Sequence, residues 1–247
     1  MATEISFSLL RRRDVLRLAV AGMAIAGPMG ALAQGAPKPK PKLGLIGSGN
    51  VGSNLGRVWA QKGYQVMFSS RDLDADKRLV AQVAANSRAG TPQEAAAFGD
   101  VLVFAVPYGA LPELGKTLGA SLKGKVVIDA SNPFPQRDGA IADEAREQGA
   151  GVVSARLLPG ARIVRAFNAV GAARMGAMNS TPGTVGMPMA SDDKQAIDIA
   201  SQLIRDIGFE PVLVGGLAMG KYLMPGTPLA GEHSPDEIRK IAATLKP

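Results

Sequence analysis

Three glycines near the start of the chain have the spacing of a phosphate-binding turn. Gly47, Gly49 and Gly52 form the pattern Gly-x-Gly-x-x-Gly. In such a turn the first glycine allows a sharp exit from a strand. The second has no side chain to block a pyrophosphate, and the third lets the next helix pack close to the strand. The backbone N–H groups that open the helix would face the anion, aided by the helix dipole. The expected ligand contacts are Gly47, Ser48, Gly49, Asn50, Val51 and Gly52.

The Gly-x-Gly-x-x-Gly pattern alone is weak evidence, because a chain with 30 glycines contains such spacings by chance. The residues around the glycines supply the context that the pattern needs. An apolar run at residues 43–46 predicts a buried parallel strand. Apolar residues then recur at helical spacing at Val51, Leu55, Val58 and Trp59. A strand, a glycine turn and a helix in succession favour a dinucleotide site over a glycine turn that binds nothing.

The end of the second predicted strand, residues 65–69, indicates which dinucleotide is bound. Enzymes that prefer NAD place Asp or Glu about 20 residues after the glycines, where it binds the ribose 2′-hydroxyl. Here the chain reads Ser69, Ser70 and Arg71. A hydroxyl and a guanidinium suit a 2′-phosphate, which a carboxylate would repel. NADP is therefore favoured over NAD, although Asp72 follows directly, and an ordinary surface arginine is the alternative for Arg71.

The next predicted strand, residues 101–106, is stopped by a proline, so its end should lie beside the cofactor at the carboxyl edge of the sheet. The expected contacts there are Ala105, Val106 and Pro107. Tyr108 follows, and we expect it to pack over the cofactor. After a further strand at residues 125–130, Asn132 either orients the nicotinamide or caps a turn.

The remaining patterns alternate between helix and strand. Helices are predicted at residues 73–86, 92–97, 110–122, 192–207 and 235–245, and strands at 163–164, 184–189 and 211–214. Thr91 and Ser234 have the spacing of capping boxes at the starts of two of these helices.

Taken together, these segments resemble the coenzyme F420-dependent NADP oxidoreductase family. The pieces that carry the resemblance are residues 46–52, Ser70-Arg71, residues 105–107, residues 129–133, residues 165–168 and the segment 192–209. The resemblance implies an α/β fold with a doubly wound Rossmann-type parallel sheet, NADP across the strand ends, and a small C-terminal segment that completes the site. Ser48, Ser70 and Arg71 match the family's phosphate-holding positions. Met224 departs from the family, which usually has an acidic residue before the corresponding proline.

The amino terminus has the features of an export signal. Arg12 and Arg13 precede a short apolar segment, and Ala31-Leu32-Ala33 supplies a cleavage site. The arginine pair resembles the twin-arginine motif. We therefore expect a signal peptide at 1–33, a proline- and lysine-rich linker at 34–41, an NADP-binding domain at 42–165 and a C-terminal α/β segment at 166–247 that forms the second-substrate side. We therefore expect the protein to be periplasmic or exported, with no stable membrane span after cleavage. The alternative is that the segment is never cut and serves as a membrane anchor.

The chemistry available narrows the function. The chain has no cysteine, which excludes disulfides and thiolate nucleophiles. The single histidine, His233, lies in a proline-flanked loop, where we expect it to be exposed rather than catalytic. No metal site and no catalytic acid or base is assigned. Hydride transfer suits this inventory because it needs position more than proton chemistry.

Three functions remain open. The first is hydride transfer between NADP(H) and a deazaflavin or flavin-like partner such as coenzyme F420. The second is reduction of another acceptor by NADPH: a ferric chelate, a small carbonyl or an imine. The third is a nucleotide-binding module without catalysis. The net charge is +7, but no basic face with interleaved aromatic residues indicates nucleic acid. The expected partner is a small redox molecule, and a homodimer is left open as the assembly.

Overall fold

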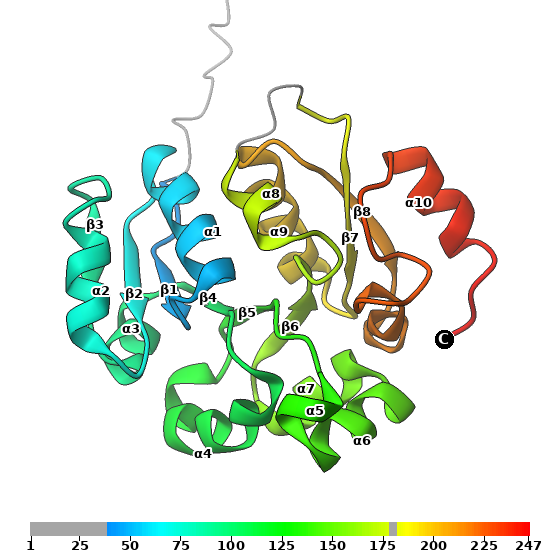
Figure 1. Cartoon of the computed structure of the whole chain (residues 1–247), viewed down its shortest axis with the longest axis horizontal. Coiled ribbons are helices and arrows are strands. Elements are labelled where there is room, and N and C mark those ends of the chain that lie inside the picture. The colour runs from blue at the N-terminus through cyan, green and yellow to red at the C-terminus, as the bar shows by residue number, and fades with distance from the viewer. Residues whose placement is uncertain (1–38, 178–181) are drawn as a thin grey trace, which may run out of the picture. The chain divides into compact units, whose positions relative to one another are not determined.

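The alternation of apolar strands with amphipathic helices produces one β-sheet that has helices on both faces (Figure 1). The computed structural model describes residues 39–177 and 182–247. The expected signal peptide and residues 34–38 of the expected linker lie outside the described residues. No helix in the described ranges has the length and apolar character that crossing a bilayer requires.

Eight strands form the sheet in the order β3-β2-β1-β4-β5-β6-β7-β8. They are β1 (Leu43–Ile46), β2 (Val66–Ser69), β3 (Ser87–Ala89), β4 (Val101–Phe104), β5 (Val126–Asp129), β6 (Arg162–Arg165), β7 (Gly186–Ala190) and β8 (Glu210–Gly215). The first six are parallel, in the order of the doubly wound dinucleotide fold. The predicted fold class is confirmed.

The last two strands modify the expected parallel sheet. β7 pairs with β6 in the antiparallel direction, at Arg165 and Ala190, and β8 is parallel to β7. Antiparallel neighbours do not need a crossover on one face of the sheet. The chain between β6 and β7 instead contains the short helix α8 (Ala172–Gly176), which packs against the first helix. The sheet is thus continuous from the first half of the chain into the second.

The helices agree with the predictions in part. Those in the described residues are α1 (Asn50–Gln61), α2 (Leu73–Val80), α3 (Pro92–Phe98), α4 (Leu111–Leu122), α5 (Pro135–Asp138), α6 (Ala140–Gln148), α7 (Ala150–Leu157), α8, α9 (Lys194–Asp206) and α10 (Pro235–Ala242), with 3-10 turns η1 (Tyr108–Ala110) and η2 (Leu217–Leu223). Both predicted capping boxes form, at Thr91 with Glu94 and at Ser234 with Glu237. α2 ends at Val80, before the predicted end at residue 86, because the chain turns there into the edge strand β3.

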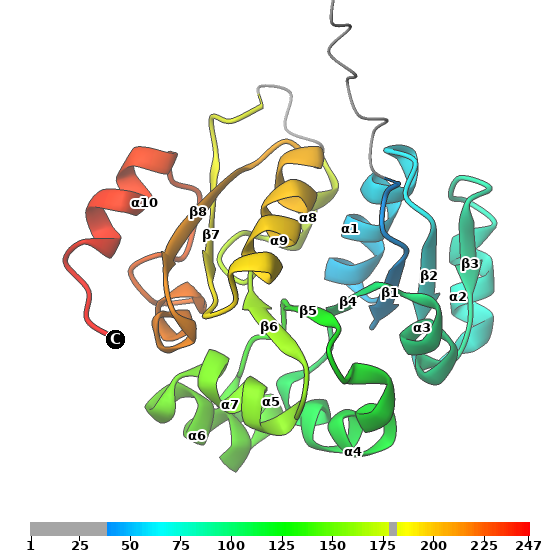
Figure 2. The same cartoon turned by 180° about the vertical axis from the view of Figure 1, so that it is seen from behind.

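Each strand sends alternate side chains to opposite faces, and this creates two core layers. On one face Leu45, Val103 and Ile128 pack with residues of α1 and α9. On the other, Leu102, Phe104 and Val127 pack with α3, α4, α6 and α7. Figure 2 shows the same two helical layers from behind. The carboxyl ends of the parallel strands and the loops that follow them therefore lie together at one edge of the sheet.

Candidate dinucleotide site

The glycine turn between β1 and α1 has the geometry that its three glycines require. Gly47 has a φ of +101°, and a Cβ there would lie 2.3 Å from the Ala105 carbonyl oxygen. A Cβ at Gly52 would lie 1.8 Å from the carbonyl oxygen of Gly47. At Gly49, in contrast, no heavy atom of the described residues beyond the adjoining backbone lies within 4 Å of a Cβ position. Gly47 and Gly52 are therefore required by the fold itself, whereas the space over Gly49 is open to a ligand.

The first helix begins at this turn without a side-chain cap. Gly49 is the N-cap residue, and no side chain among the described residues caps the N–H groups of the first turn. The first turn carries no acidic side chain either. Unpaired N–H groups and the positive end of the helix dipole form an anion-binding site.

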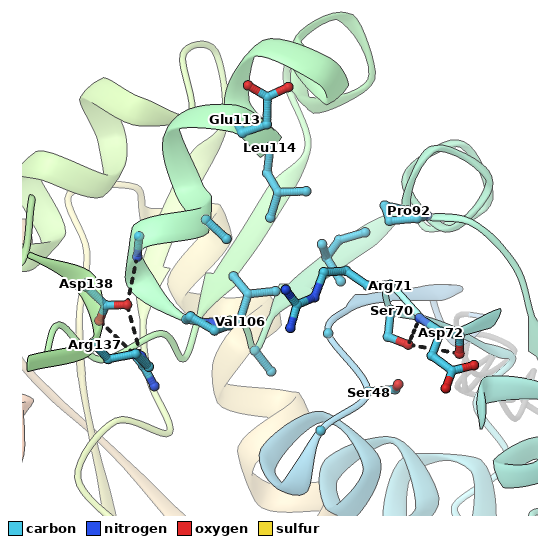
Figure 3. Close-up of a pocket in the computed structure, with 17 residues that line it drawn as sticks. Ser48, Ser70, Arg71, Asp72, Pro92, Val106, Glu113, Leu114, Arg137 and Asp138 are labelled. Atoms are coloured by element: carbon cyan, nitrogen blue, oxygen red, sulfur yellow. Dashed lines mark hydrogen bonds and ion pairs between the residues drawn. The ribbon is translucent and has the colours of Figure 1, made fainter. Parts of the chain in front are cut away.

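A cavity of about 810 Å³ opens over the turn (Figure 3). Many of the predicted site residues line it together: Gly47, Ser48, Gly49, Ser70, Arg71, Ala105, Val106 and Pro107. A second cavity of about 200 Å³ adjoins it and shares Ala105, Val106 and Pro107. The second cavity is also lined by Asn50, Val51 and Asn132.

Three of the sequence-predicted residues, Gly52, Ser69 and Tyr108, line neither cavity. Ser69 is fully buried at the end of β2, where its hydroxyl donates to the Leu45 carbonyl at 2.6 Å. Tyr108 is also fully buried, and its hydroxyl donates to the carbonyl of Ala150 at 2.8 Å. Burial raises the pKa of the Tyr108 phenol, and the nearby Asp129 carboxylate adds to the effect. The η1 turn directs this side chain into the core, so it does not pack over the candidate cofactor site.

Arg71 brings a positive charge to the larger cavity, which Arg137 also lines. Its guanidinium points into the cavity toward Val106 (Figure 3). In the part of the chain that the structure describes, no carboxylate pairs with it. Ser70 lies beside it at the end of β2. This placement is what an interaction with a ribose 2′-phosphate requires.

A buried acid that the sequence did not single out lies behind the two serines. Asp76 of α2 is fully buried, and it accepts hydrogen bonds from the hydroxyls of Ser48 and Ser70. The available signal was its position on α2, three and four residues before the inner-face residues Leu79 and Val80. An acid on the inner face of a helix indicates a buried partner.

Arg137 and Asp138, which the sequence analysis also did not single out, line the larger cavity as well. Arg137 lines both cavities, and its guanidinium donates to the Asn132 carbonyl at 2.7 Å and lies 5.0 Å from the centre of the Phe134 ring. Asp138 beside it is held by Arg137 at 2.8 Å and by the backbone N–H groups of Phe134 and Gly109. Burial opposes ionisation of Asp138, but these hydrogen bonds outweigh it, so the pKa of this carboxyl lies below its usual value.

The floor of the smaller cavity depends on a loop–loop contact. The Asn132 side-chain amide donates to the Asn168 carbonyl at 2.9 Å. Asn168 follows Phe167, which has a φ of +65° in the left-handed region that bulky residues rarely adopt. Backbone strain of this kind is concentrated at functional sites. Asn132 is thus fixed in place, with its side-chain oxygen buried and without a hydrogen-bond partner in the described residues.

Proton-transfer and metal chemistry have few candidates here. His233 lines neither cavity, and its Nε2 lies 3.2 Å from the Ala230 carbonyl oxygen. Residues 39–177 and 182–247 contain no group of three or more His, Cys, Asp or Glu side chains placed to hold a metal ion. The arrangement instead offers an anion-binding turn, a basic residue at one end and a second cavity at the other.

Comparison with known proteins agrees with this geometry. Residues 42–133 match the sequence profile of the family described as NADP oxidoreductase, coenzyme F420-dependent. Over 200 residues the chain is 30% identical to the F420-dependent NADP reductase of Methanothermobacter marburgensis. The matched region covers 75% of this chain and 88% of that protein.

Two further relatives extend the comparison. The chain is 28% identical over 195 residues to the metalloreductase STEAP3 of Rattus norvegicus. The matched region covers 78% of this chain but only 37% of the rat protein. The chain thus spans little more than a third of that relative's length. A crystal structure of a hypothetical protein from Sinorhizobium meliloti superposes with a TM-score of 0.65 at 27% identity, covering 78% of this chain and 95% of that one.

Proposed function

The chain belongs to the family of coenzyme F420-dependent NADP oxidoreductases and is an NADP-dependent oxidoreductase, and we propose that it transfers a hydride between NADP(H) and a deazaflavin or flavin-like partner. The observation that carries the proposal is the pair of adjoining cavities that share the turn of Ala105, Val106 and Pro107. The larger one is lined by residues of the glycine turn and by Arg71, and Asn132 is among the residues that line the smaller one.

The residues present fit NADP(H) along this path. Arg71 would hold the 2′-phosphate, with Ser70 beside it, and the N–H groups at the start of α1 would hold the pyrophosphate. Asn132 would then lie beside the nicotinamide ring of the bound NADP(H). NADP(H) supplies the hydride, and the chain's own contribution is to hold the two partners in register and to exclude water from between them.

The smaller cavity suits a planar acceptor. Phe134 is 39% exposed at its edge, with Arg137 stacked on the ring. An exposed aromatic ring and a guanidinium form a platform on which a flat heterocycle can stack. Met224, where the family usually has an acid, is buried in the core and lines neither cavity, so this departure does not change the walls of the proposed site.

The experiment that tests the proposal follows the nicotinamide absorbance band with purified protein and NADPH. Coenzyme F420, flavin mononucleotide, a ferric chelate and a cyclic imine would be offered as acceptors in parallel. We expect turnover with F420 or the flavin. NADPH binding without turnover of any acceptor would support a nucleotide-binding module instead, and turnover only with the imine would assign another substrate class.

A second candidate has one observation in its favour. The likeness to rat STEAP3, a metalloreductase, makes a ferric chelate the first alternative acceptor. In that case we expect iron reduction to need added flavin, because the described residues contain no group of three or more His, Cys, Asp or Glu side chains placed to hold a metal ion. Ferric reduction by NADPH alone, at the same rate with and without flavin, would contradict this route.

We also propose that the protein is exported with its cofactor already bound. The support is the sequence pattern of Arg12 and Arg13 before a short apolar segment and a cleavage site. The twin-arginine route carries folded proteins, so NADP(H) could be loaded before transport. Mass spectrometry of the nucleotide that copurifies with the protein from the periplasmic fraction would test this, and an empty protein there would contradict it.

A further inference from the structure

Asp76 is a fully buried carboxylate at the border of the larger cavity. Its Oδ2 accepts a hydrogen bond from the Ser70 hydroxyl at 2.8 Å, and its Oδ1 accepts one from the Ser48 hydroxyl. Ser48 comes from the glycine turn and Ser70 directly follows β2, so the carboxylate joins the two segments that meet at the candidate phosphate site. Among the described residues no lysine, arginine or histidine forms an ion pair with it.

The direction of these hydrogen bonds decides what the serines offer a ligand. A serine hydroxyl has one proton and two lone pairs. The Ser48 proton is directed at Asp76, and the Ser70 proton is shared between Asp76 at 2.8 Å and the Asp72 carbonyl at 3.2 Å. Ser70 Oγ also accepts from the Asp72 N–H at 3.1 Å, which leaves it one lone pair. Neither proton is directed into the cavity, so toward a ligand these hydroxyls act as acceptors. A ribose 2′-hydroxyl can donate to such an acceptor. A 2′-phosphate dianion can only accept, and therefore would have to draw the serine protons away from Asp76.

That exchange is unfavourable at a buried site. If the serines turned toward a phosphate, the carboxylate of Asp76 would lose the only side-chain hydrogen bonds that the structure gives it. A buried charge without partners is costly. In addition, the phosphate and the carboxylate would both be negative, separated only by the serine side chains, and like charges in a poorly solvated site repel. Arg71 points into the cavity and would attract the same phosphate from that side.

We infer that Asp76 is a specificity-determining residue that lowers the affinity for a 2′-phosphorylated nucleotide relative to its 2′-hydroxyl counterpart. Arg71 and Asp76 then act in opposite directions on the same phosphate, so the preference for NADPH over NADH is smaller than Arg71 alone would give. The inference rests on the proposed nucleotide site and specifies which nucleotides that site accepts.

The test measures the binding of 2′,5′-ADP and 5′-AMP to the purified protein by calorimetry. For the wild type we expect 2′,5′-ADP to bind less than about 10-fold more tightly than 5′-AMP, which is less than one charge-assisted contact would give alone. Asp76→Asn keeps the size of the side chain and removes its charge. One serine can then donate to the phosphate, and we expect this variant to prefer 2′,5′-ADP about 10-fold more strongly than the wild type does.

Asp74→Asn is the matched control. It removes the same charge from the same helix, but Asp74 is 74% exposed and paired with Lys77. We expect its preference between the two nucleotides to equal that of the wild type. Circular dichroism and the thermal midpoint establish that each variant is folded.

Two results would overturn the inference. One is a wild-type preference for 2′,5′-ADP above about 100-fold, since Asp76 would then not offset Arg71; this result needs no variant. The other is an unchanged or weaker preference in folded Asp76→Asn, which would make Asp76 a support for the two serines only. Neither nucleotide carries a nicotinamide, so the outcome is independent of hydride transfer. A protein that shows the Asp76 effect but reduces no acceptor would refute the proposed function alone.

Discussion

Asp129 and Arg165 are paired residues on the adjacent strands β5 and β6 and form an ion pair in which neither side chain is exposed to solvent. Arg165 Nη1 lies 2.7 Å from Asp129 Oδ2 and 2.7 Å from the Ser131 carbonyl oxygen. Ser154 of α7 donates to the same carboxylate oxygen at 2.6 Å. The pair therefore fixes the start of the loop that carries Asn132.

The space for this arginine is made by two glycines from different elements. A Cβ at Gly151 of α7 or at Gly220 of η2 would lie 3.1 Å from Arg165 Cγ. The guanidinium consequently lies where β6, α7 and η2 meet, and its Nε and Nη2 have no hydrogen-bond partner in the described residues. An ion pair so enclosed is costly to break from one side.

We expect Asp129→Ala to lower the free energy of unfolding by about 3–5 kcal/mol, because it leaves the buried guanidinium without its counter-ion. Urea denaturation would measure this. Asp236→Ala is the control, because Asp236 is 82% exposed and its pair with Arg239 lies on the surface of α10, where such pairs contribute little. Equal losses in the two variants would show that the buried pair has no special role.

Arg71→Glu should weaken NADPH far more than NADH. The change removes a charge-assisted contact to the 2′-phosphate, which contributes roughly 1.5–3 kcal/mol, and adds repulsion. Dissociation constants for both cofactors, measured by fluorescence titration, would show it. Arg78→Glu makes the same charge change on α2, but its side chain is 70% exposed and lines neither cavity. If both cofactors weaken equally in Arg71→Glu, then Arg71 does not bind the 2′-phosphate.

The parts of the fold that the sequence predicted are those specified locally. The glycine turn needs particular φ angles and close contacts, and only glycine meets them, so Gly47 and Gly52 could be recognised without the structure. The strands at Leu43–Ile46 and Val101–Phe104 are apolar throughout because helices cover both of their faces. Turn chemistry and hydrophobic pattern are properties of neighbouring residues.

What the sequence did not predict depends on distant partners. β3 has only three residues, and its place at the sheet edge comes from pairing with β2. The helices α5, α6 and α7 are short and are joined at Gly139 and Gly149, so no long periodic pattern marks them. Asp76 and Arg137 belong to the candidate site only through contacts with other elements. Composition around a charged residue does not reveal such contacts.

The proposed export signal gives a prediction that concerns residues outside the described ranges. Arg12→Lys with Arg13→Lys should keep the protein in the cytoplasm, folded and able to bind NADP(H). The positive charge is retained, so a route that needs only charge would tolerate the change, whereas one that recognises the arginine pair would not. Cell fractionation would follow both the processed form and the nucleotide-binding activity. Efficient export of the double-lysine variant, cleaved after Ala33, would rule out the twin-arginine route.

Acid should weaken the contact between β6 and the start of α9. Arg162 binds Asp193 with two hydrogen bonds of 2.6 Å, and Asp193 also accepts from the Ala196 backbone N–H. The hydrogen bonds from Arg162, with that of Ala196, lower the pKa of Asp193 to about 2 from its usual 3.8. Because the folded-state pKa is the lower one, this stabilisation is present above pH 3.8 and is lost as the pH falls toward 2.

We therefore expect Asp193→Asn to remove part of the decline in unfolding free energy between about pH 4 and pH 2. Allowing for solvent contact at the partly exposed pair, the difference should be roughly 1–2 kcal/mol. Urea denaturation at a series of pH values would measure it. Asp198→Asn, on the exposed face of α9, should leave the profile as it is in the wild type. A profile that Asp193→Asn does not flatten would assign the acid sensitivity to other carboxyls.

The glycine turn allows binding to be separated from folding by two single substitutions. At Gly49 the φ is −67° and the Cβ position is open, so Gly49→Val should fold with a thermal midpoint near that of the wild type. Its side chain would occupy the space of the pyrophosphate, and we expect NADPH binding to be lost. At Gly52 even one methyl group would collide with the Gly47 carbonyl, so Gly52→Ala should lower the free energy of unfolding by about 1–3 kcal/mol or more. Thermal melts and NADPH titrations of both variants give four measurements. A folded Gly49→Val that binds NADPH as the wild type does would show that the dinucleotide does not cross this turn.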